Sequence, residues 1–319
     1  MYSDQMEKLR KIVDITSKIA VCSRSFSKNP QLRSLLLNEF SNVKFNETGS
    51  QFTGDELIQF IKECDKVIIG LEKINSEILS QLPDLKVISK YGVGLDNIDI
   101  QALKKYEIKL GWVGGVNKRS VAELVLGLIF CLTRHIVISN NEIKKGGWSQ
   151  NVGSELTGKT IGIIGCGNIG KDLAILLRPF SCKILAYDIK KYETFYLENN
   201  IQGVNLEKLL RESDVITLHV PLNSSTKNIL SEESLSIIKD NAILINTARG
   251  GLVDEVSLKK CLLEKPFMRA AFDVFNIEPP IDNDLLNLPN FICTPHIGGS
   301  TNESILAMGK AAIEGLKIS

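Results

Sequence analysis

Short apolar runs alternate with stretches of helical period along almost the whole chain, and this alternation constrains the fold more than any other feature. In the second half, six apolar runs recur with regular spacing, at residues 160–165, 183–188, 215–220, 242–247, 269–274 and 291–294. Alternating strands and helices predict a parallel sheet with helices on both faces. Six strands are the number in two joined mononucleotide-binding halves, so we expect a doubly wound α/β fold.

The first third repeats the alternation. Its predicted strands are 18–23, 66–70, 86–92 and 108–113, and its predicted helices are 29–40, 53–64 and 76–82. We expect Asn29, Thr53 and Ser76 to cap these helices, because their side chains accept hydrogen bonds from the N–H groups of a first turn. Residues 117–147 form the longest helical pattern, apolar on more than one face through Phe130, which predicts one buried connector helix.

Length and composition limit the class of protein. The chain has 319 residues, 44% of them hydrophobic, which is enough for two domains with a core each. Its 38 basic and 37 acidic residues give a net charge of +1, which argues against a nucleic-acid partner. The charged start of the chain lacks the apolar stretch of a secretory signal, and no apolar run is long enough to span a bilayer. We therefore expect a cytoplasmic protein without a membrane partner.

The seven cysteines are scattered and mostly lie in apolar runs, as Cys22 and Cys293 do. This pattern favours buried thiols in a reducing compartment. No cysteine pair or nearby histidine has a zinc-ligand spacing, so no metal site is expected.

Polar and glycine residues gather where the six strands of the second half end. The strands run into GCGNIG, YD, HVPL, NTARGG, DVFNIEPP and TPHIGG, whereas the strand bodies stay apolar. Open α/β sheets bind ligands at the carboxyl ends of their strands. Six such ends in register predict one binding crevice.

The first of these ends carries a dinucleotide-binding motif. Gly165, Gly167 and Gly170 fit GxGxxG between a strand and a helix, where glycines allow a tight turn, the approach of a pyrophosphate and close helix packing. Asp188 ends the next strand, where a carboxylate can bind a ribose 2′-hydroxyl and repel a 2′-phosphate. NAD is therefore the expected cofactor, while the two lysines that follow shortly after, at 190 and 191, keep NADP open.

Three further strand ends carry Arg249, Glu278 and His296, a set that suits reduction of a 2-keto acid by NADH. Arg supplies planar, forked donors for the carboxylate and carbonyl. His supplies a proton near neutral pH, and a carboxylate can orient the imidazolium and stabilise its charge. The cofactor supplies the hydride.

Each of the three residues also fits a structural role when it is considered singly. Arg249 lies in a turn sequence, Glu278 precedes two prolines as a loop acid could, and His296 could be a structural histidine. Of the other histidines, His135 is interpreted as a packing residue. His219, which ends a strand before a proline, is the rival proton donor and ranks below His296.

These stretches resemble the D-isomer-specific 2-hydroxyacid dehydrogenases. The resemblance rests on GKTIGIIGCGNIG, HVPL, INTARGGLVDE, DVFNIEPP and TPHIGGST, together with KYGVGLDNID and SVAELVLGLI in the earlier part of the chain. It implies a Rossmann NAD-binding domain inserted into a flavodoxin-like substrate domain that the last helix rejoins. The expected domains are 115–296 for NAD and 1–114 with 297–319 for the substrate. Hinges are expected near 113–119 and 295–299.

The resemblance also implies the site residues. Arg249, Glu278 and His296 are the implied catalytic residues. The implied cofactor-binding residues are Gly165, Gly167, Asn168, Ile169, Gly170, Asp188, His219, Val220, Pro221, Thr226, Thr247, Ala248, Arg249, Asp273, His296 and Gly298, with Asp273 near the nicotinamide amide. The implied substrate-binding residues are Lys90, Tyr91, Val93, Gly94, Arg249 and His296. A homodimer through the NAD-binding domain is implied as well.

The sequence limits the class of substrate but does not identify the particular acid. Glu278 stands where related formate dehydrogenases carry Gln, which favours a hydroxy acid and keto acid pair. The loop at 88–99 is most similar to phosphoglycerate and hydroxypyruvate reductase members. Residues 68–73 lack the basic stretch of many phosphoglycerate dehydrogenases, and Lys73 or Lys90 is left as a substitute contact for a phosphate. Because related corepressors keep the same three catalytic residues, an NAD(H)-sensing scaffold remains the alternative function.

Overall fold

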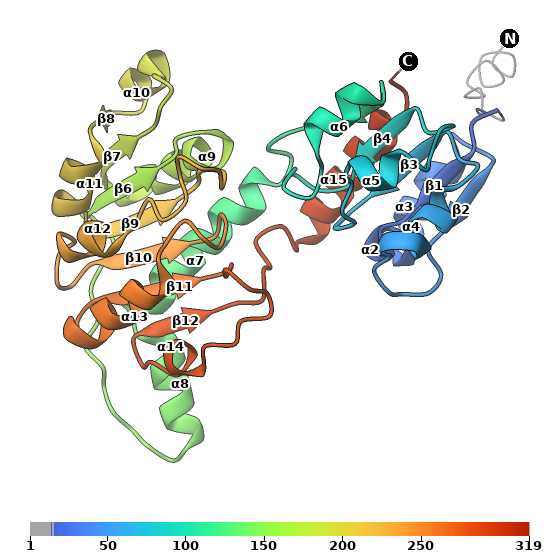
Figure 1. Ribbon diagram of the computed structural model, residues 1–319. Coiled ribbons are helices and arrows are strands. Elements are labelled where there is room, and N and C mark those ends of the chain that lie inside the picture. Colours follow the sequence, from blue (N-terminus) through green and yellow to red (C-terminus); the bar gives the residue numbers. More distant parts are fainter. Residues whose placement is uncertain (1–13, 15, 319) are drawn as a thin grey trace, which may run out of the picture. The chain divides into compact units, whose positions relative to one another are not determined.

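The computed structural model describes residue 14 and residues 16–318, so the charged segment at the start of the chain lies outside the described part. The described residues form two compact units, one that runs to Asn117 and resumes at Asn302, and one of residues 118–301. Figure 1 shows an α/β arrangement in each unit. The boundaries lie a few residues beyond the expected positions 114/115 and 296/297, and the two hinges stay a prediction.

The first unit contains a parallel sheet in the order β2-β1-β3-β4-β5 among its described residues. Its strands are β1 (Ile19–Val21), β2 (Val43–Phe45), β3 (Lys66–Ile69), β4 (Val87–Lys90) and β5 (Lys109–Gly111). Its helices are α2 (Arg24–Lys28), α3 (Pro30–Leu37), α4 (Gly54–Ile61), α5 (Ser76–Leu79), α6 (Ile100–Lys105) and α15 (Asn302–Gly315). This strand order is the flavodoxin-like one.

The last helix of the chain packs in the first unit. α15 contributes Ala312 and Ile313 to the core formed with α2, α3 and one face of the sheet, while α4, α5 and α6 cover the other face. The hydroxyl of Ser89 in β4 donates to the carbonyl of Ala312 at 2.6 Å. A Cβ on Gly111 would overlap the backbone of Gly315, so β5 and α15 approach each other without intervening side chains.

The second unit contains a longer parallel sheet in the order β12-β11-β10-β9-β6-β7-β8. Its strands are β6 (Thr160–Ile164), β7 (Lys183–Tyr187), β8 (Ile201–Gly203), β9 (Val215–Leu218), β10 (Ile243–Asn246), β11 (Arg269–Phe272) and β12 (Phe291–Cys293). The helices are α7 (Lys118–Thr133), α8 (Ile136–Lys144), α9 (Asn168–Leu177), α10 (Glu193–Glu198), α11 (Leu206–Glu212), α12 (Glu232–Ser236), α13 (Glu255–Glu264) and α14 (Asn283–Leu286).

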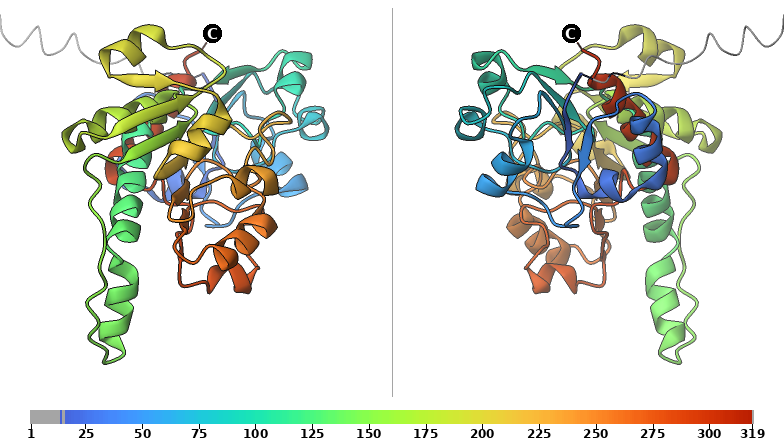
Figure 2. Two further views of the ribbon diagram at one scale, coloured as in Figure 1. Left: turned by 90° about the vertical axis from the view of Figure 1, so that its left-hand side faces the viewer. Right: turned by 90° about the vertical axis from the view of Figure 1, so that its right-hand side faces the viewer.

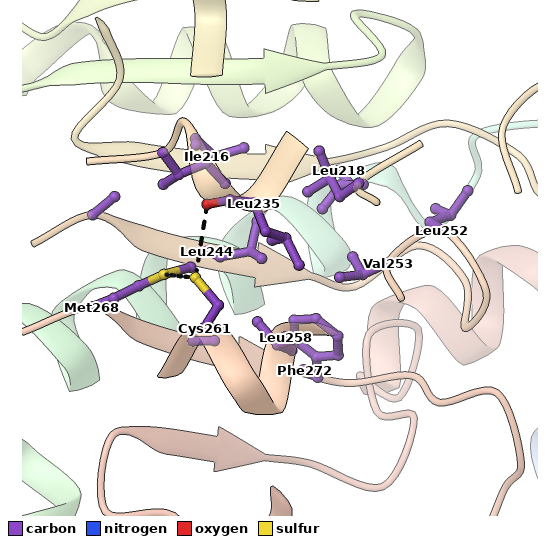
Figure 3. Close-up of a cluster of buried hydrophobic side chains, with 14 of the residues drawn as sticks. Ile216, Leu218, Leu235, Leu244, Leu252, Val253, Leu258, Cys261, Met268 and Phe272 are labelled. Carbon is purple, nitrogen blue, oxygen red and sulfur yellow. Dashed lines mark hydrogen bonds between the residues drawn. The ribbon is translucent and has the colours of Figure 1, made fainter. Parts of the chain in front are cut away.

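The inner strands of the second unit bury successive residues on opposite faces, as the period of two requires. In β10, Ile243 and Ile245 belong to the core beneath α7 and α9, whereas Leu244 belongs to the core beneath α11, α12 and α13. Figure 3 shows Leu244 in this second core, close to Leu258 of α13. The strand order is the Rossmann order with one added edge strand, so the predicted fold class is confirmed.

The prediction of one connector helix over 117–147 is wrong. The helix breaks after Thr133, because His135 adopts a left-handed backbone with φ 54° and starts α8 at an angle of 60° to α7. α7 is buried in the core as expected, but along one side only, whereas α8 has no buried residue and projects from the sheet of its unit (Figure 2). No single described helix is long and apolar enough to cross a membrane, and only the bent α7–α8 pair reaches that length together.

Smaller differences concern helix starts and edge strands. Asn29 caps α3 as predicted, and Thr53 stands at the start of α4 without a capping bond from its side chain. The cap of α5 is Asn75 and not Ser76, since the Asn75 side chain accepts from Ile78 N–H. The strands β2 and β8, both short and at a sheet edge, were not predicted from the sequence. Cys293, expected to be buried, is exposed on the edge strand β12.

Candidate active site

The glycine motif forms a strand-turn-helix in which each glycine meets a different constraint. Gly165 has φ +94°, and a Cβ there would lie 2.8 Å from the His219 backbone. A Cβ on Gly170 would overlap the carbonyl of Gly165, so α9 packs directly against the turn. A Cβ on Gly167 would meet nothing within 4 Å, which leaves room for a ligand at the start of α9. The turn follows β6, beside β9, where the strand order reverses.

The start of α9 fits a pyrophosphate. Within the described residues, no side chain caps the helix, so the N–H groups of its first turn remain available to an anion. Asp188 lies at the end of β7, and its carboxylate accepts the N–H groups of Cys166 and Lys190 at 2.8 Å each. The carboxylate therefore fixes the middle of the glycine turn and stands beside the expected ribose position.

At the end of β9, His219 is neutral in the folded chain. Burial lowers the pKa of its imidazole to about 3. Its Nε2 shares a 3.0 Å hydrogen bond with the hydroxyl of Thr217, and its buried Nδ1 has no partner among the described residues. Near neutral pH a histidine of this kind is a neutral imidazole and lacks the imidazolium proton that a general acid donates. The Thr226 hydroxyl, in the turn that follows Val220 and Pro221, donates to the Pro221 carbonyl at 2.6 Å and braces that turn.

We expect the ring signals of His219 in an NMR titration to stay unchanged between about pH 8 and about pH 5. The unfolded chain takes up this proton near the ordinary value of 6.5, whereas the folded chain does so only near 3. The free energy of unfolding therefore decreases as the pH falls below 6.5, because the unfolded chain then binds a proton at His219 that the folded chain does not. Above that pH the contribution of His219 to stability is fully present. His219→Gln assigns the signal, and a His219 midpoint between about pH 6 and 7 would contradict the burial argument.

The end of β10 presents Arg249 on a braced turn. The Asn246 side chain accepts from Ala248 N–H at 3.1 Å and donates to the Arg249 carbonyl at 2.8 Å. Arg249 Nη1 donates to the Ala248 carbonyl at 2.6 Å. Thr247 is buried, and its hydroxyl has no partner within the described chain, which fits a ligand group at this strand end. Asn246, which was not predicted as a site residue, is buried and holds this turn.

His296 and Glu278 are in direct contact. His296 Nδ1 lies 2.8 Å from Glu278 Oε2, and because a carboxylate accepts, Nδ1 carries the hydrogen. Glu278 Oε1 accepts the N–H of Phe275 at 3.1 Å, which sets the direction of the carboxylate. The His296 side chain is 50% exposed, so the ring is accessible to a ligand. An imidazole held by a carboxylate in this way is a general acid–base arrangement.

Asp273, expected near the nicotinamide, holds the loop that carries His296. Its buried carboxylate accepts Ile297 N–H at 2.7 Å and Gly298 N–H at 2.8 Å. Its backbone carbonyl accepts His296 N–H at 2.9 Å. The Ser120 hydroxyl of α7 donates to the Gly298 carbonyl at 2.7 Å from the other side. Ser120 is a second residue that the sequence analysis missed.

Four of the predicted substrate-binding residues lie in the first unit, at the end of β4: Lys90, Tyr91, Val93 and Gly94. Tyr91 is buried against Phe26 with ring centroids 5.4 Å apart, and burial raises the pKa of its hydroxyl. The carbonyl of Val93 accepts from Trp112 Nε1 at 2.9 Å, and Gly94 is half-buried. Lys90, also buried, has a separate role.

Lys90 is held inside the first unit. Its ammonium donates to the Gly70 carbonyl and, at 2.8 Å, to Asn97 Oδ1. Asn97 in turn donates to the Glu72 carbonyl, and Glu72 Oε2 accepts Gly70 N–H at 2.6 Å. Lys90 therefore pins the loop after β3 and does not extend toward a phosphate, while Lys73 is exposed.

The site of the second unit thus collects the glycine turn, the Arg249 turn and the Glu278–His296 pair at the carboxyl edge of one sheet. Among residues 14 and 16–318, no three His, Cys, Asp or Glu side chains gather as a metal ion requires. A dinucleotide turn together with a carboxylate-held imidazole is typical of a nicotinamide-linked oxidoreductase.

Comparison with known proteins agrees with this class. Residues 126–298 match the family model of the D-isomer specific 2-hydroxyacid dehydrogenase NAD binding domain. Hydroxypyruvate reductase of Thermotoga maritima is 41% identical over 286 residues, which are 88% of this chain and 92% of that one. D-lactate dehydrogenase of Aquifex aeolicus, solved with NAD and lactic acid, has a TM-score of 0.81 at 28% identity and covers 93% of both chains. A protein of Polaromonas sp. described as a D-isomer specific 2-hydroxyacid dehydrogenase has a TM-score of 0.86 at 28% identity, over 94% of this chain and 95% of that one.

The chain belongs to the D-isomer-specific 2-hydroxyacid dehydrogenases. The prediction of an oxidoreductase acting on a hydroxy acid and keto acid pair is confirmed at this level.

Proposed function

We propose that Arg249, Glu278 and His296 carry the reaction, in which a 2-keto acid is reduced to its D-2-hydroxy acid by NADH. The observation that carries the proposal is the 2.8 Å contact between His296 Nδ1 and Glu278 Oε2, in the unit that also holds the glycine motif. The bound nicotinamide supplies the hydride. Side chains of the protein must then supply the proton and stabilise the charges that develop during the reaction.

The roles follow from the chemistry of each group. Arg249 pairs with the substrate carboxylate and polarises the carbonyl, since its guanidinium offers paired donors. His296 gives the carbonyl oxygen a proton as the hydride arrives, and Glu278 orients the ring and stabilises the imidazolium. Burial lowers the pKa of His219, and its Nε2 is bonded to the Thr217 hydroxyl, so both features favour His296 over His219 as the proton donor. Asp273 keeps the His296 loop in place.

The remaining predicted cofactor residues line the same strand ends. We propose that the α9 start binds the pyrophosphate through the backbone from Gly167 to Ile169. The turn from His219 to Pro221 and the strand end with Thr247 and Ala248 would then flank the nicotinamide half. The orphaned Thr247 hydroxyl and His219 Nδ1 support this placement, because a bound ligand gives buried polar atoms the partners they lack.

We propose NAD as the preferred cofactor, because the Asp188 carboxylate hydrogen-bonds a 2′-hydroxyl and repels a 2′-phosphate. Asp188→Asn should keep the acceptor for Cys166 N–H but lose the charge. We expect the ratio of kcat/KM for NADH to that for NADPH to fall by about tenfold or more, the worth of one charged hydrogen bond. Glu193→Gln, in exposed α10, removes the same charge nearby and should leave the ratio unchanged. An unchanged ratio in Asp188→Asn would contradict the assignment.

We propose a small, unphosphorylated 2-keto acid, hydroxypyruvate or glyoxylate, as the substrate. Two observations support this choice over 3-phosphoglycerate. The Lys90 ammonium is buried and held by Gly70 and Asn97, so it does not substitute for a phosphate contact. The loop of residues 70–73 exposes the apolar Leu71, which is 66% accessible, beside a single exposed lysine.

The test is NADH oxidation with hydroxypyruvate, glyoxylate, pyruvate and 2-ketoisocaproate, and NAD reduction with 3-phosphoglycerate. The proposal expects the highest kcat/KM for hydroxypyruvate or glyoxylate. A higher value for 3-phosphoglycerate would overturn the substrate proposal and leave the reaction class intact.

We propose that the chain forms a homodimer through α8 and the segment that follows it. Ile143, Trp148 and Val152 are 56%, 81% and 91% exposed, and apolar residues gathered in this way mark protein interfaces. The chain of 35.3 kDa should therefore sediment as a dimer, and Ile143→Asp together with Trp148→Asp should shift it to a monomer. Leu197→Asp, at an equally exposed apolar residue of α10, is the control. A wild-type chain that sediments as a monomer would contradict the proposal.

We propose the cytoplasm as the compartment, with no nucleic-acid or membrane partner. The seven cysteines are all free thiols, which suits a reducing environment, and the net charge of +1 offers no field for a polyanion. Cell fractionation with the protein in the membrane pellet would contradict this proposal.

A further inference from the structure

The loop that carries Glu278 is held by a residue outside the reacting groups. This loop spans residues 275–282 between β11 and α14. Glu255, the first residue of α13, accepts the N–H of Asn276 through Oε1 at 2.7 Å. The Glu255 carboxylate is partly buried beneath the loop, and the loss of water raises its pKa above the ordinary value. The contact therefore fixes the backbone two residues before Glu278.

A second contact from the same helix fixes the other end of the loop. Lys259 Nζ lies 2.9 Å from Asp282 Oδ2, and the ammonium helps to hold the Asp282 pKa below its ordinary value. The other oxygen of Asp282 accepts the N–H of Leu285 and starts α14. Because Glu255 and Lys259 are four residues apart, they lie on one face of α13. Their two contacts stand on either side of Glu278.

The helix that makes these contacts is itself firmly placed. Leu258 and Cys261 of α13 are buried in the core on the sheet, next to Phe272 of β11 (Figure 3). Phe272 directly precedes Asp273 and the Glu278 loop. The sheet therefore fixes both the start of the loop and the helix that supports it.

An open pocket of about 430 Å³ lies beside the loop, lined by residues of the loop and of α13 and α14, among them Val256, Ile277 and Ile281. The acidic groups at its wall are already engaged, since Asp254 accepts from Ser257 N–H, while Glu255 and Asp282 make the contacts above. On this side the loop is therefore attached to α13 through Glu255 and Lys259.

We propose that Glu255 is a positioning residue for the Glu278–His296 pair, with Lys259 as its second anchor. The inference rests on the proposed function of that pair. Glu255 acts through the Asn276 peptide, which sets where the Glu278 carboxylate meets His296 Nδ1. When the attachment is lost, the carboxylate shifts and the ring is no longer held in its catalytic orientation. Substrate and cofactor contacts are untouched, so the defect falls on the chemical step.

Kinetics of matched variants test this separation. Glu255→Ala and Lys259→Met should each lower kcat by about tenfold, with KM for NADH and for the keto acid within about twofold of wild type. Glu255→Gln, which keeps an oxygen acceptor for Asn276 N–H, should restore most of kcat. The control is Lys260→Met, which removes an equally close ion pair of the same helix, 2.7 Å to Glu232 of α12, away from the loop. If Glu255→Ala does not fold, the kcat of Lys259→Met tests the proposal.

Ring NMR signals of His296 give a readout that needs no turnover, and the chain has only three histidines. We expect the His296 signal in Glu255→Ala to move from its wild-type position toward that in Glu278→Gln, and to stay in place in Lys260→Met. Wild-type kcat and an unmoved signal in Glu255→Ala would overturn the inference, as would equal losses in Lys260→Met. If the wild-type chain turns over no keto acid but the signal moves as expected, the proposed function fails and the positioning role stands.

Discussion

His296→Asn should lower kcat for keto acid reduction by about 10²- to 10⁴-fold, the usual contribution of a positioned acid–base group. Asparagine retains a polar side chain that can meet Glu278 but has no proton to give near neutral pH. It also suits the backbone, because His296 has φ 54° and asparagine tolerates this left-handed region better than most residues. NADH affinity, measured by fluorescence titration, should stay close to wild type.

The chain offers a close control for this substitution. His135 has the same φ of 54°, but it lies at the break between α7 and α8 and shares a contact with Arg269, at the opposite end of β11 from the site. His135→Asn should therefore keep the wild-type kcat. Near-normal turnover in His296→Asn with NADH still bound would remove His296 from the proposed mechanism.

Gly250→Ala should be the most damaging small substitution at the site. An added Cβ would overlap the carbonyl of Phe275 and lie 2.5 Å from Asn276 N, so backbone and not a flexible side chain blocks it. The turn of Arg249 and the start of the Glu278 loop must then move apart. A displacement of about 1 Å can cost about 10²-fold in rate, and overpacking costs about 1–3 kcal/mol of unfolding free energy.

Both effects can be measured on one preparation, by kcat/KM and by denaturant unfolding. Gly127→Ala, on an open part of α7 with nothing within 4 Å of the added Cβ, is the matched control. It should leave kcat/KM unchanged and raise stability by about 0.5–1 kcal/mol, because alanine favours a helix. A Gly250→Ala variant with wild-type kcat/KM would show that Arg249 and the Glu278 loop do not depend on this close approach.

The parts of the fold that could be predicted are those that depend on short-range sequence patterns. The glycine turn depends on three glycines within six residues, and its strand and helix follow from the apolar period on either side. The strands of both cores are continuous apolar runs, as expected for sheets covered on both faces. The edge strands β2 and β8 were not predicted because only one of their six residues, Ile201, is buried, so neither strand forms an apolar run.

The break after α7 has no local signal. The segment that returns from α8 crosses the end of α7, where Ser154 N–H donates to the Thr133 carbonyl at 2.9 Å and a Cβ on Gly153 would overlap it. This contact joins residues far apart in sequence, so the helical pattern of 117–147 contains no indication of it. Helix propensity was overridden by packing.

The residues of the candidate site could likewise be predicted only in part. Arg249, Glu278 and His296 could be proposed from their places at strand ends, with Glu278 as the carboxylate that orients His296, and the structure adds the 2.8 Å distance between the two side chains. The supports that hold them were not visible, because Ser120 meets Gly298 and Asp273 meets Ile297 across long sequence separations. The burial of Lys90 was equally hidden, since a lysine in a loop motif gives no sign of the carbonyl that holds it.

The most direct test of the account is turnover by the wild-type chain with saturating NADH and hydroxypyruvate or glyoxylate, with chiral analysis of the product from hydroxypyruvate. The account predicts NADH oxidation in step with formation of the D-2-hydroxy acid, lost in Arg249→Ala and His296→Asn. Tight NADH binding with no oxidation on any 2-keto acid would contradict it and favour an NAD(H)-sensing scaffold.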